Sequence, residues 1–161
     1  MTEAFVGIGS NVQPEQHVRQ AVKLMRERFG ALRLSPVYRN KAVGFEGDDF
    51  LNLVAAFDTA LGVAELNAAL DEIELACGRE RGAPRFAPRT LDLDLLLYGE
   101  RVDAALRLPR KEILEYAFVL KPLMDLAGVH RHPGTGMTYK EHWVRFTGDR
   151  SGLVAVDVPG L

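Results

Sequence analysis

Cysteine is almost missing from this sequence, because Cys77 is the one example among 161 residues. A single cysteine excludes an intrachain disulfide framework and is typical of a reducing compartment, so we expect a cytoplasmic protein. Cys77 falls on an apolar helical stripe, which favours a buried small hydrophobe over a reactive nucleophile. A signal-peptide pattern and an apolar run of membrane-spanning length are also missing.

The sequence has little net charge, because 20 basic side chains stand against 22 acidic ones for a formal net charge of −2. This balance gives no general attraction to nucleic acid or to an anionic membrane, so basic residues matter only where they cluster. Internal repeats and low-complexity tracts are missing as well. The length suits one domain with a sizeable core, and we expect residues 1–161 to form a single domain.

Hydrophobic periodicity predicts four strands and two helices in the first hundred residues. The predicted strands are Ala4–Gly9, Ala31–Tyr38, Phe50–Thr59 and a segment from Leu91 to Leu97. Apolar stripes at helical spacing follow Pro14 and Gly62, and Gly30 and Gly78 are plausible helix ends. The order β-α-β-β-α-β predicts an α+β protein with a ferredoxin-like core.

Strand geometry sends alternate side chains to opposite faces of this sheet. Val6, Leu53 and the leucines at 91, 93, 95 and 97 then lie on the face that the two helices cover. Polar, aromatic and glycine positions from three strands share the opposite, open face: Gly7, Gly9, Phe50, Asn52, Asp92 and Asp94. Their convergence indicates a functional site.

The segment from Gly78 to Asp94 carries the chemistry. Asp92 and Asp94 are two residues apart on a strand, so both carboxylates face the same way and repel one another. A hard cation such as Mg²⁺ relieves that repulsion, and the four arginines of the preceding Gly/Pro-containing loop match phosphate oxygens. Residue types alone leave two interpretations open: a magnesium-polyphosphate site, or a solvated acidic face beside a basic loop.

After Gly99 the pattern is weaker and predicts only short elements. We expect extra helices at Glu112–Tyr116 and at Pro122–Ala127, with Pro122 at the helix start, and a short strand within Leu153–Val158. His132-Pro133-Gly134 is typical of a turn. His130, His132 and His142 lack an obvious further ligand, so they are a weak indication of zinc.

Several motifs together resemble the 6-hydroxymethyl-7,8-dihydropterin pyrophosphokinase family of folate biosynthesis. The most specific is Arg85-Phe86-Ala87-Pro88-Arg89-Thr90-Leu91-Asp92-Leu93-Asp94-Leu95. Supporting matches are Gly9-Ser10-Asn11, Phe50-Leu51-Asn52, Ile73-Glu74-Leu75 with Gly78-Arg79, and Phe118-Val119-Leu120 with Pro122-Leu123. The resemblance extends to about Thr138 and implies a monomeric transferase that moves a pyrophosphoryl group from ATP to the pterin hydroxymethyl group, leaving AMP.

The resemblance also implies roles for particular residues. Asp92 and Asp94 match ligands of two Mg²⁺ ions, and Arg79 and Arg89 match phosphate-gripping, catalytic arginines. The ATP-binding set would be Glu74, Arg79, Arg81, Arg85 and Arg89, with Arg81 and Arg85 on a lid that excludes water. The pterin-binding set would be Gly9, Val43, Phe50, Asn52, Asp92 and Phe118, in which Phe50 and Phe118 sandwich the ring and Asn52 reads its edge.

The sequence departs from the family in four places. Asn40-Lys41-Ala42-Val43-Gly44 replaces a proline-containing loop, Arg110 and Lys111 replace a histidine and an aromatic residue, Tyr116 replaces an arginine, and Phe86 stands where tryptophan is common. As a hypothesis, Arg107, Arg110 and Lys111 compensate by contacting phosphate or ribose, which adds them to the ATP-binding set.

Three other functions use similar features. An RNA-recognition module shares the element order, but its aromatic-rich central motif is missing and the acidic pair would repel phosphate without metal. A polymerase-palm-like nucleotidyltransferase uses paired aspartates and releases pyrophosphate instead of AMP. A non-catalytic homologue would bind pterin or nucleotide without turnover, which the retained arginines, aspartates and aromatic pair argue against.

Overall fold

The computed structural model describes residues 1–42, 47–78, 91–150 and 152–161. Its strands are β1 (Thr2–Ser10), β2 (Arg33–Leu34), β3 (Val37–Asn40), β4 (Phe50–Thr59), β5 (Asp92–Tyr98) and β6 (Val154–Val156). Its helices are α1 (Pro14–Phe29), α2 (Val63–Ala76), α3 (Glu112–Glu115), α4 (Ala117–Ala127) and α5 (Tyr139–Arg145), with a 3₁₀ turn at Ala104–Leu106. None of these helices is both long and apolar enough to cross a membrane.

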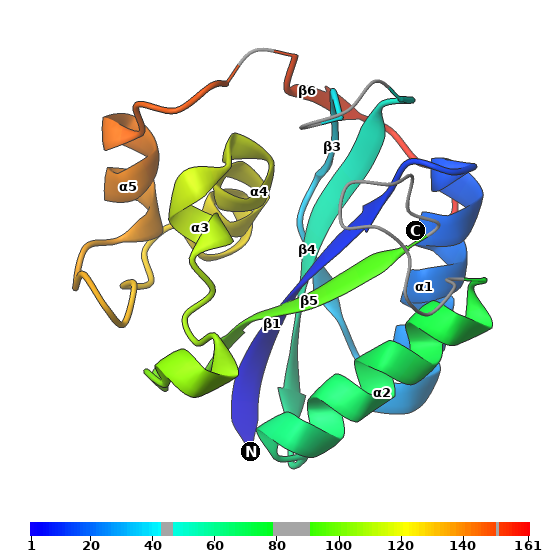
Figure 1. Cartoon of the computed structure of the whole chain (residues 1–161), viewed down its shortest axis with the longest axis horizontal. Helices are drawn as coiled ribbons and strands as arrows, with labels where there is room; N and C mark the ends of the chain where they lie inside the picture. The colour runs from blue at the N-terminus through cyan, green and yellow to red at the C-terminus, as the bar shows by residue number, and fades with distance from the viewer. Residues whose placement is uncertain (43–46, 79–90, 151) are drawn as a thin grey trace.

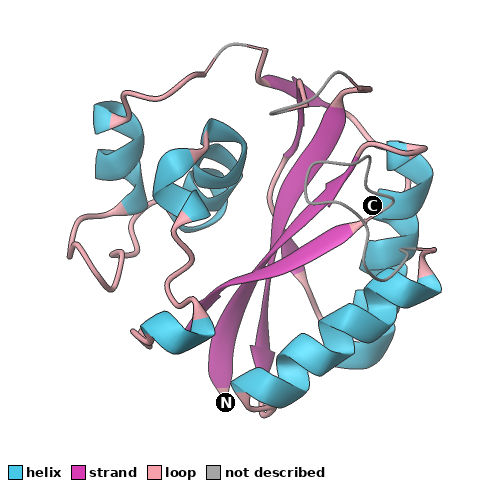
Figure 2. Ribbon diagram, in the orientation of Figure 1, coloured by secondary structure: helices cyan, strands magenta, loops and turns pink. Residues whose placement is uncertain are grey.

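A twisted antiparallel sheet separates two groups of helices (Figures 1 and 2). The strand order is β5-β1-β4-β3-β6, and β2 also pairs with β4. Strands β1 and β4 are therefore central, and β5 is the fourth strand of the predicted β-α-β-β-α-β core. The α+β class and the ferredoxin-like order are confirmed.

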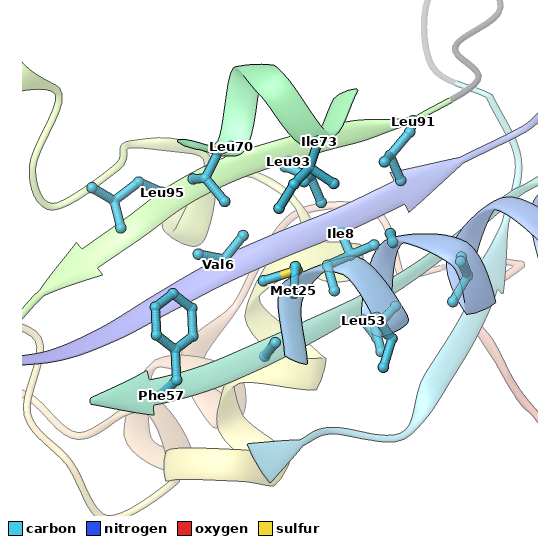
Figure 3. Packing of buried hydrophobic residues seen from close by; sticks show 14 of the residues in the cluster. Val6, Ile8, Met25, Leu53, Phe57, Leu70, Ile73, Leu91, Leu93 and Leu95 are labelled. Atoms are coloured by element: carbon cyan, nitrogen blue, oxygen red, sulfur yellow. The ribbon is translucent and has the colours of Figure 1, made fainter. Parts of the chain in front are cut away.

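The main hydrophobic core lies between the sheet and helices α1 and α2. Figure 3 shows Leu70 and Ile73 of α2 over Leu93 and Leu95 of β5, with Met25 of α1 beside the central strands. Cys77 belongs to the same cluster and is 4% exposed, which confirms its predicted role as a buried small hydrophobe. Burial, with a smaller contribution from the charge of Glu74, raises the pKa of the Cys77 thiol and keeps it unreactive.

The opposite face is not open along its whole length, as the sequence pattern had suggested. A second apolar cluster covers one end of it, where Phe5, Val54, Ala56 and Leu96 of the sheet pack against helices α3 to α5. The helices contribute Ile113, Leu120, Leu123, Ala127 and Tyr139 to this cluster. The predicted site residues that belong to the strands, namely Gly9, Phe50, Asn52, Asp92 and Asp94, lie toward the other end of the same face.

A bulge in β5 overturns the prediction for Leu97. Val6 pairs with Leu95, but Phe5 pairs with Leu97, so Leu96 is an extra residue in the ladder. The extra residue reverses the alternation, and Leu97 joins Leu96 in the second cluster instead of facing α2. One strand thereby supplies leucines to both cores.

The predicted strand at Ala31–Tyr38 is wrong in its continuity, because the structure has β2 and β3 with a break at Ser35-Pro36. Pro36 has no N–H to donate to a strand ladder. Ser35 keeps the connection to β4 through two hydrogen bonds: its N–H donates to the Val54 carbonyl, and its Oγ accepts from the Val54 N–H. The seam between β3 and β4 is thus held by a side chain at the break.

Helix α4 corrects the prediction for Pro122, which lies inside the helix and not at its start. The helix begins five residues earlier, at Ala117, so Phe118 lies in its first turn. Helix α5 was not predicted; Thr138 caps it by accepting a hydrogen bond from the Glu141 N–H at 3.1 Å. The short helix α3, strand β6 and the turn at Pro133-Gly134 are confirmed.

A buried histidine closes the turn that leads into α5. His132 is 6% exposed, and its Nδ1 accepts hydrogen bonds from the backbone N–H groups of Gly134 and Thr135 at 3.0 and 3.1 Å. Burial lowers the pKa of His132, and the neighbouring His142 lowers it further. The folded state therefore takes up a proton at this ring less readily than the unfolded chain.

We expect the free energy of unfolding to fall as the pH drops below the ordinary histidine value of 6.5, because the unfolded imidazole then binds a proton that the folded one resists. His132→Asn supplies a carboxamide oxygen as the turn acceptor without a titrating group. Urea unfolding between pH 5.5 and 8 checks this, with a flatter pH dependence for the variant. Equal slopes for the two proteins would contradict it.

Candidate active site

Three predicted site residues form one row across three neighbouring strands. Gly9 of β1 pairs with Asn52 of β4 on one side and with Asp92 of β5 on the other. The adjacent row on the same face pairs Gly7 with Asp94. Adjacent strands lie about 4.8 Å apart, so Asn52 and Asp92 flank Gly9 at roughly twice that spacing. The sheet register thus brings the predicted amide and the predicted carboxylates together.

Gly9 allows the Asn52 side chain to lie over the β1 backbone. A Cβ at position 9 would stand 2.7 Å from Asn52 Oδ1, closer than such atoms approach. At Gly7 the nearest atoms to an added Cβ belong to Leu96, at 3.5 Å or more, which is ordinary contact. Of the two glycines, Gly9 is the one that the site geometry requires.

Asp94 has a cationic neighbour. The Arg110 guanidinium lies 3.3 Å from Asp94 Oδ1 and 3.5 Å from Glu112 Oε2. The Asp94 side chain is half-exposed and that of Arg110 is largely buried, so solvent screens this pair only in part. Arg110 is therefore shared between Asp94 and Glu112 in the structure, instead of extending into solvent as a free phosphate contact.

Glu74 is buried behind the acidic pair. Its side chain is 5% exposed, and its Oε2 accepts a hydrogen bond from the Leu93 N–H at 2.8 Å. Leu93 lies between Asp92 and Asp94, so this bond from α2 fixes the backbone that carries both carboxylates. Glu74 is therefore not a plain surface residue.

Two surface pockets adjoin the residues described so far. One, of about 350 Å³, brings Glu74, Asp94, Arg107 and Arg110 together between α2, β5 and the 3₁₀ turn. The other, of about 290 Å³, is lined by Asn40, Lys41, Tyr116, Phe118 and Arg150. Lys111 is exposed and lines neither of these pockets.

Phe118 lies in the second pocket with one face already covered by an aromatic ring. The Tyr116 and Phe118 rings stack with centroids 5.0 Å apart and planes 20° from parallel. Phe50, the other predicted aromatic, is half-buried at the start of β4 and pairs with Asn40. The structure thus places Phe50 and Phe118 in the two elements that border Asn40.

Helix α4 is fixed beside β3 by a polar contact. The Tyr38 hydroxyl donates a hydrogen bond to Asp125, whose other oxygen accepts from Lys121 Nζ at 2.7 Å. Burial, with added contributions from the hydrogen bond and charge of Asp125, raises the pKa of Tyr38 well above its ordinary value. The hydroxyl remains a donor, and the contact fixes the element that carries Phe118.

Five predicted site residues lie outside the described residues: Val43, Arg79, Arg81, Arg85 and Arg89. Among the described residues, no group of three or more His, Cys, Asp or Glu side chains could hold a metal ion. His132 and His142 have hydrogen-bond partners within the protein: His132 Nδ1 accepts from the Gly134 N–H, and His142 Nε2 lies 2.6 Å from Thr135 Oγ1. Asp92 and Asp94 are thus the candidate metal ligands that this part of the chain offers.

Sequence reasoning missed one residue of the site, Asn40. Its side chain is 6% exposed and contacts Asn52, from which it is twelve residues distant in sequence. The β3–β4 ladder brings the two together, because Tyr38 pairs with Asn52. The sequence signal was weak, because Asn40 stands two residues after the predicted strand Ala31–Tyr38 and was assigned to the loop.

The comparisons with known proteins show which family the chain belongs to. The family model of 7,8-dihydro-6-hydroxymethylpterin-pyrophosphokinase matches residues 5–128. The chain belongs to this family. The predicted family is therefore confirmed, and with it the class of enzyme, a transferase of the pyrophosphokinase type.

Two bacterial relatives are similar over most of their own lengths. A Pseudomonas aeruginosa 2-amino-4-hydroxy-6-hydroxymethyldihydropteridine pyrophosphokinase is 42% identical over 139 residues, covering 80% of this chain and 83% of that protein. A Bacillus subtilis protein of the same name is 32% identical over 156 residues, covering 93% of each.

Other relatives are much longer than this chain. A mitochondrial folate synthesis bifunctional protein from Pisum sativum is 38% identical over 161 residues, but this chain spans only 30% of it. A crystal structure of Plasmodium falciparum HPPK-DHPS superposes with a TM-score of 0.71 at 10% identity, covering 91% of this chain and 44% of that one. That likeness supports the fold alone.

Gly9→Ala should displace the Asn52 amide and weaken pterin binding about tenfold or more, because the lost amide contact leaves a polar group without its partner. Gly7→Ala, with room for its methyl group, is the matched control. Calorimetric titration with the pterin checks both, after circular dichroism has shown that each variant is folded. Equal affinities for the two variants would contradict the assignment of Gly9.

Proposed function

We propose that this chain transfers a pyrophosphoryl group from ATP to the hydroxymethyl group of 6-hydroxymethyl-7,8-dihydropterin, giving the pterin diphosphate and AMP in folate biosynthesis. The observation that carries the proposal is the row of Asn52, Gly9 and Asp92 across β4, β1 and β5, with Asp94 in the adjacent row. An amide for a heterocycle and a carboxylate pair for metal-bound phosphates then face one space. The family membership supports the same reaction.

The pterin ring is proposed to bind between Phe50 and Phe118, with its polar edge at Asn52. Both aromatic rings are half-buried and both border Asn40, so a flat ring placed between them also reaches the amide. Gly9, which has no side chain, leaves the space in which the Asn52 amide lies. Val43 is proposed to add a backbone contact, on the resemblance alone.

The donor set suits magnesium. Asp92 and Asp94 give hard oxygen ligands on one face, and Mg²⁺ is usually held by one or two carboxylates together with substrate phosphates. We propose that these residues hold two Mg²⁺ ions, which when bound supply charge neutralisation for the triphosphate and the attacking hydroxyl. Glu74 holds the backbone at Leu93 and so keeps the two carboxylates in position.

The cationic residues are proposed to act on ATP. Arg79 and Arg89 would grip the phosphates, and Arg81 and Arg85 would belong to a lid loop that excludes water from the reacting phosphorus. Among the described residues, Arg107 and Arg110 line the pocket beside Asp94, where phosphate or ribose would lie next to the metal ligands. Lys111 stays a proposed ATP contact on its position in the chain alone.

The whole-chain assignments remain predictions: a single pyrophosphokinase domain over residues 1–161, a monomer, and a cytoplasmic location.

The activity itself is tested by incubating the purified protein with ATP, Mg²⁺ and 6-hydroxymethyl-7,8-dihydropterin, and then separating the nucleotides. AMP should form in step with the pterin diphosphate, and only when pterin and metal are both present. Release of pyrophosphate, or pterin binding without AMP, would overturn the proposed reaction.

Asp92→Asn and Asp94→Asn should each lower kcat by several orders of magnitude, because the site loses a ligand charge for the metal. Each variant should remain folded, since one of two like charges is removed. Asp58→Asn, at an exposed position near the far end of β4, is the control and should keep normal turnover. Near-normal kcat for an Asp92 or Asp94 variant at saturating Mg²⁺ would refute the metal assignment.

Arg110→Gln should tighten Mg²⁺ binding to the free protein about two- to fivefold, because the guanidinium beside Asp94 competes with the ion and a partly exposed pair is worth up to about 1 kcal/mol. Lys111→Gln removes the same charge from an exposed neighbouring position and serves as the control. Calorimetric titration with MgCl₂ measures both. Weaker binding to Arg110→Gln, or an equal gain in both variants, would count against direct competition at Asp94.

A further inference from the structure

Two asparagine side chains form a short relay at the β3–β4 seam. Asn52 Nδ2 donates a hydrogen bond to Asn40 Oδ1 at 2.5 Å, and Asn40 Nδ2 donates to the Lys41 backbone carbonyl at 3.1 Å. Asn40 is 6% exposed, so water competes little for these bonds. The relay connects the backbone after β3 with the amide proposed to read the ligand.

The Lys41 carbonyl sets the direction of the whole relay. A carboxamide has one acceptor end and one donor end of nearly the same shape, so its orientation depends on its partners. A backbone carbonyl can only accept, and it therefore takes the Nδ2 of Asn40. The Oδ1 of Asn40 then points toward Asn52 and accepts a hydrogen bond from Asn52 Nδ2. The Oδ1 of Asn52 is left to point elsewhere.

That free oxygen faces the proposed site. Among the described residues, Asn52 Oδ1 accepts no hydrogen bond, and the residue is only partly buried. It lies against Gly9, where a Cβ would stand only 2.7 Å away. The side chain thus offers an acceptor next to the strand that separates it from Asp92.

We propose that Asn40 is a positioning residue that fixes the polarity of Asn52, so that the site selects a ring edge carrying N–H donors. The inference rests on the proposed function, in which the ring is a pterin with an exocyclic amino group and an adjacent ring N–H. An edge without donors would leave Asn52 Oδ1 unpaired in a desolvated site, at a cost that corresponds to about tenfold or more in affinity.

The test compares the preference for two ligands and not one affinity. The ligands are 6-hydroxymethylpterin and an analogue that lacks the 2-amino group and carries a methyl on N3, which removes the donors from that edge. Dissociation constants are measured by calorimetry for the wild type, Asn40→Leu and Asn40→Asp. Asn40→Leu removes both hydrogen bonds of the relay, the one to the Lys41 carbonyl and the one from Asn52. The carboxyl group of Asn40→Asp, when protonated, can still donate to Lys41 and accept from Asn52.

We expect the wild type to prefer the pterin by at least about tenfold. Asn40→Leu should lose most of that preference, because the Asn52 carboxamide can then rotate and exchange the positions of its oxygen and nitrogen. Asn40→Asp should regain most of the preference below the pKa of the new carboxyl group. Ser35→Ala is the matched control, because it removes another buried polar contact from the β3–β4 seam, the one to Val54. Its preference should equal that of the wild type.

An unchanged preference in Asn40→Leu would overturn the inference, even if both ligands bound more weakly, because a merely structural role weakens both alike. An equal loss of preference in Ser35→Ala would overturn it too. If Asn40→Leu does not fold by circular dichroism, Asn40→Ala takes its place under the same criteria. Failure of the wild type to bind pterin, with Mg²⁺-ATP still bound, would instead overturn the proposed function.

Discussion

The site depends on the register between β1 and its two neighbours. Because side chains alternate along a strand, a slip of one residue would move Asn52 or the carboxylates to the other face of the sheet. Such a slip would also expose apolar side chains, since both faces of β1 and β4 are packed: Val6 and Leu53 in one core, Phe5 and Val54 in the other. Hydrophobic burial therefore fixes the register on which the polar chemistry relies.

The second core and the candidate site share the second face of the sheet, one at each end. Helices α3 to α5 cover the end at Phe5 and Leu96, and they leave the end at Gly9 and Asp92 to the site (Figure 1). Because of the bulge at Leu96, strand β5 contributes to the site and to the second core. Its carboxylates precede the bulge, and Leu96 and Leu97 pack in the second core. The side chains of Asn52, Asp92 and Asp94 therefore do not belong to the apolar packing that stabilises this face of the sheet.

Local patterns were enough to predict the β-α-β-β-α-β order of elements along the chain, the two long helices and the shared face of Gly9, Asn52 and Asp92. The errors came where a distant contact overrides a local preference. The bulge places Leu97 on the face of the sheet opposite to the predicted one. Tertiary packing keeps Pro122 inside a helix that the sequence predicted to begin at that proline. The contact of Asn40 with Asn52 and the buried position of Glu74 depend on which strands and helices meet, and local residue patterns do not show this.

The acidic pair also raises the question of how the sheet tolerates it before metal binds. Asp92 and Asp94 lie on one face of one strand, where their mutual repulsion opposes folding. Arg110 lies 3.3 Å from Asp94 and is itself held by a backbone hydrogen bond from its N–H to the Leu96 carbonyl at 3.0 Å. The guanidinium can thus offset part of the repulsion while leaving Asp94 half-exposed to an incoming ion. On the proposed function, a metal ion at Asp94 would take the carboxylate that Arg110 pairs with in this structure. The arginine that stands in place of the family's histidine would then affect the metal centre as well as the nucleotide.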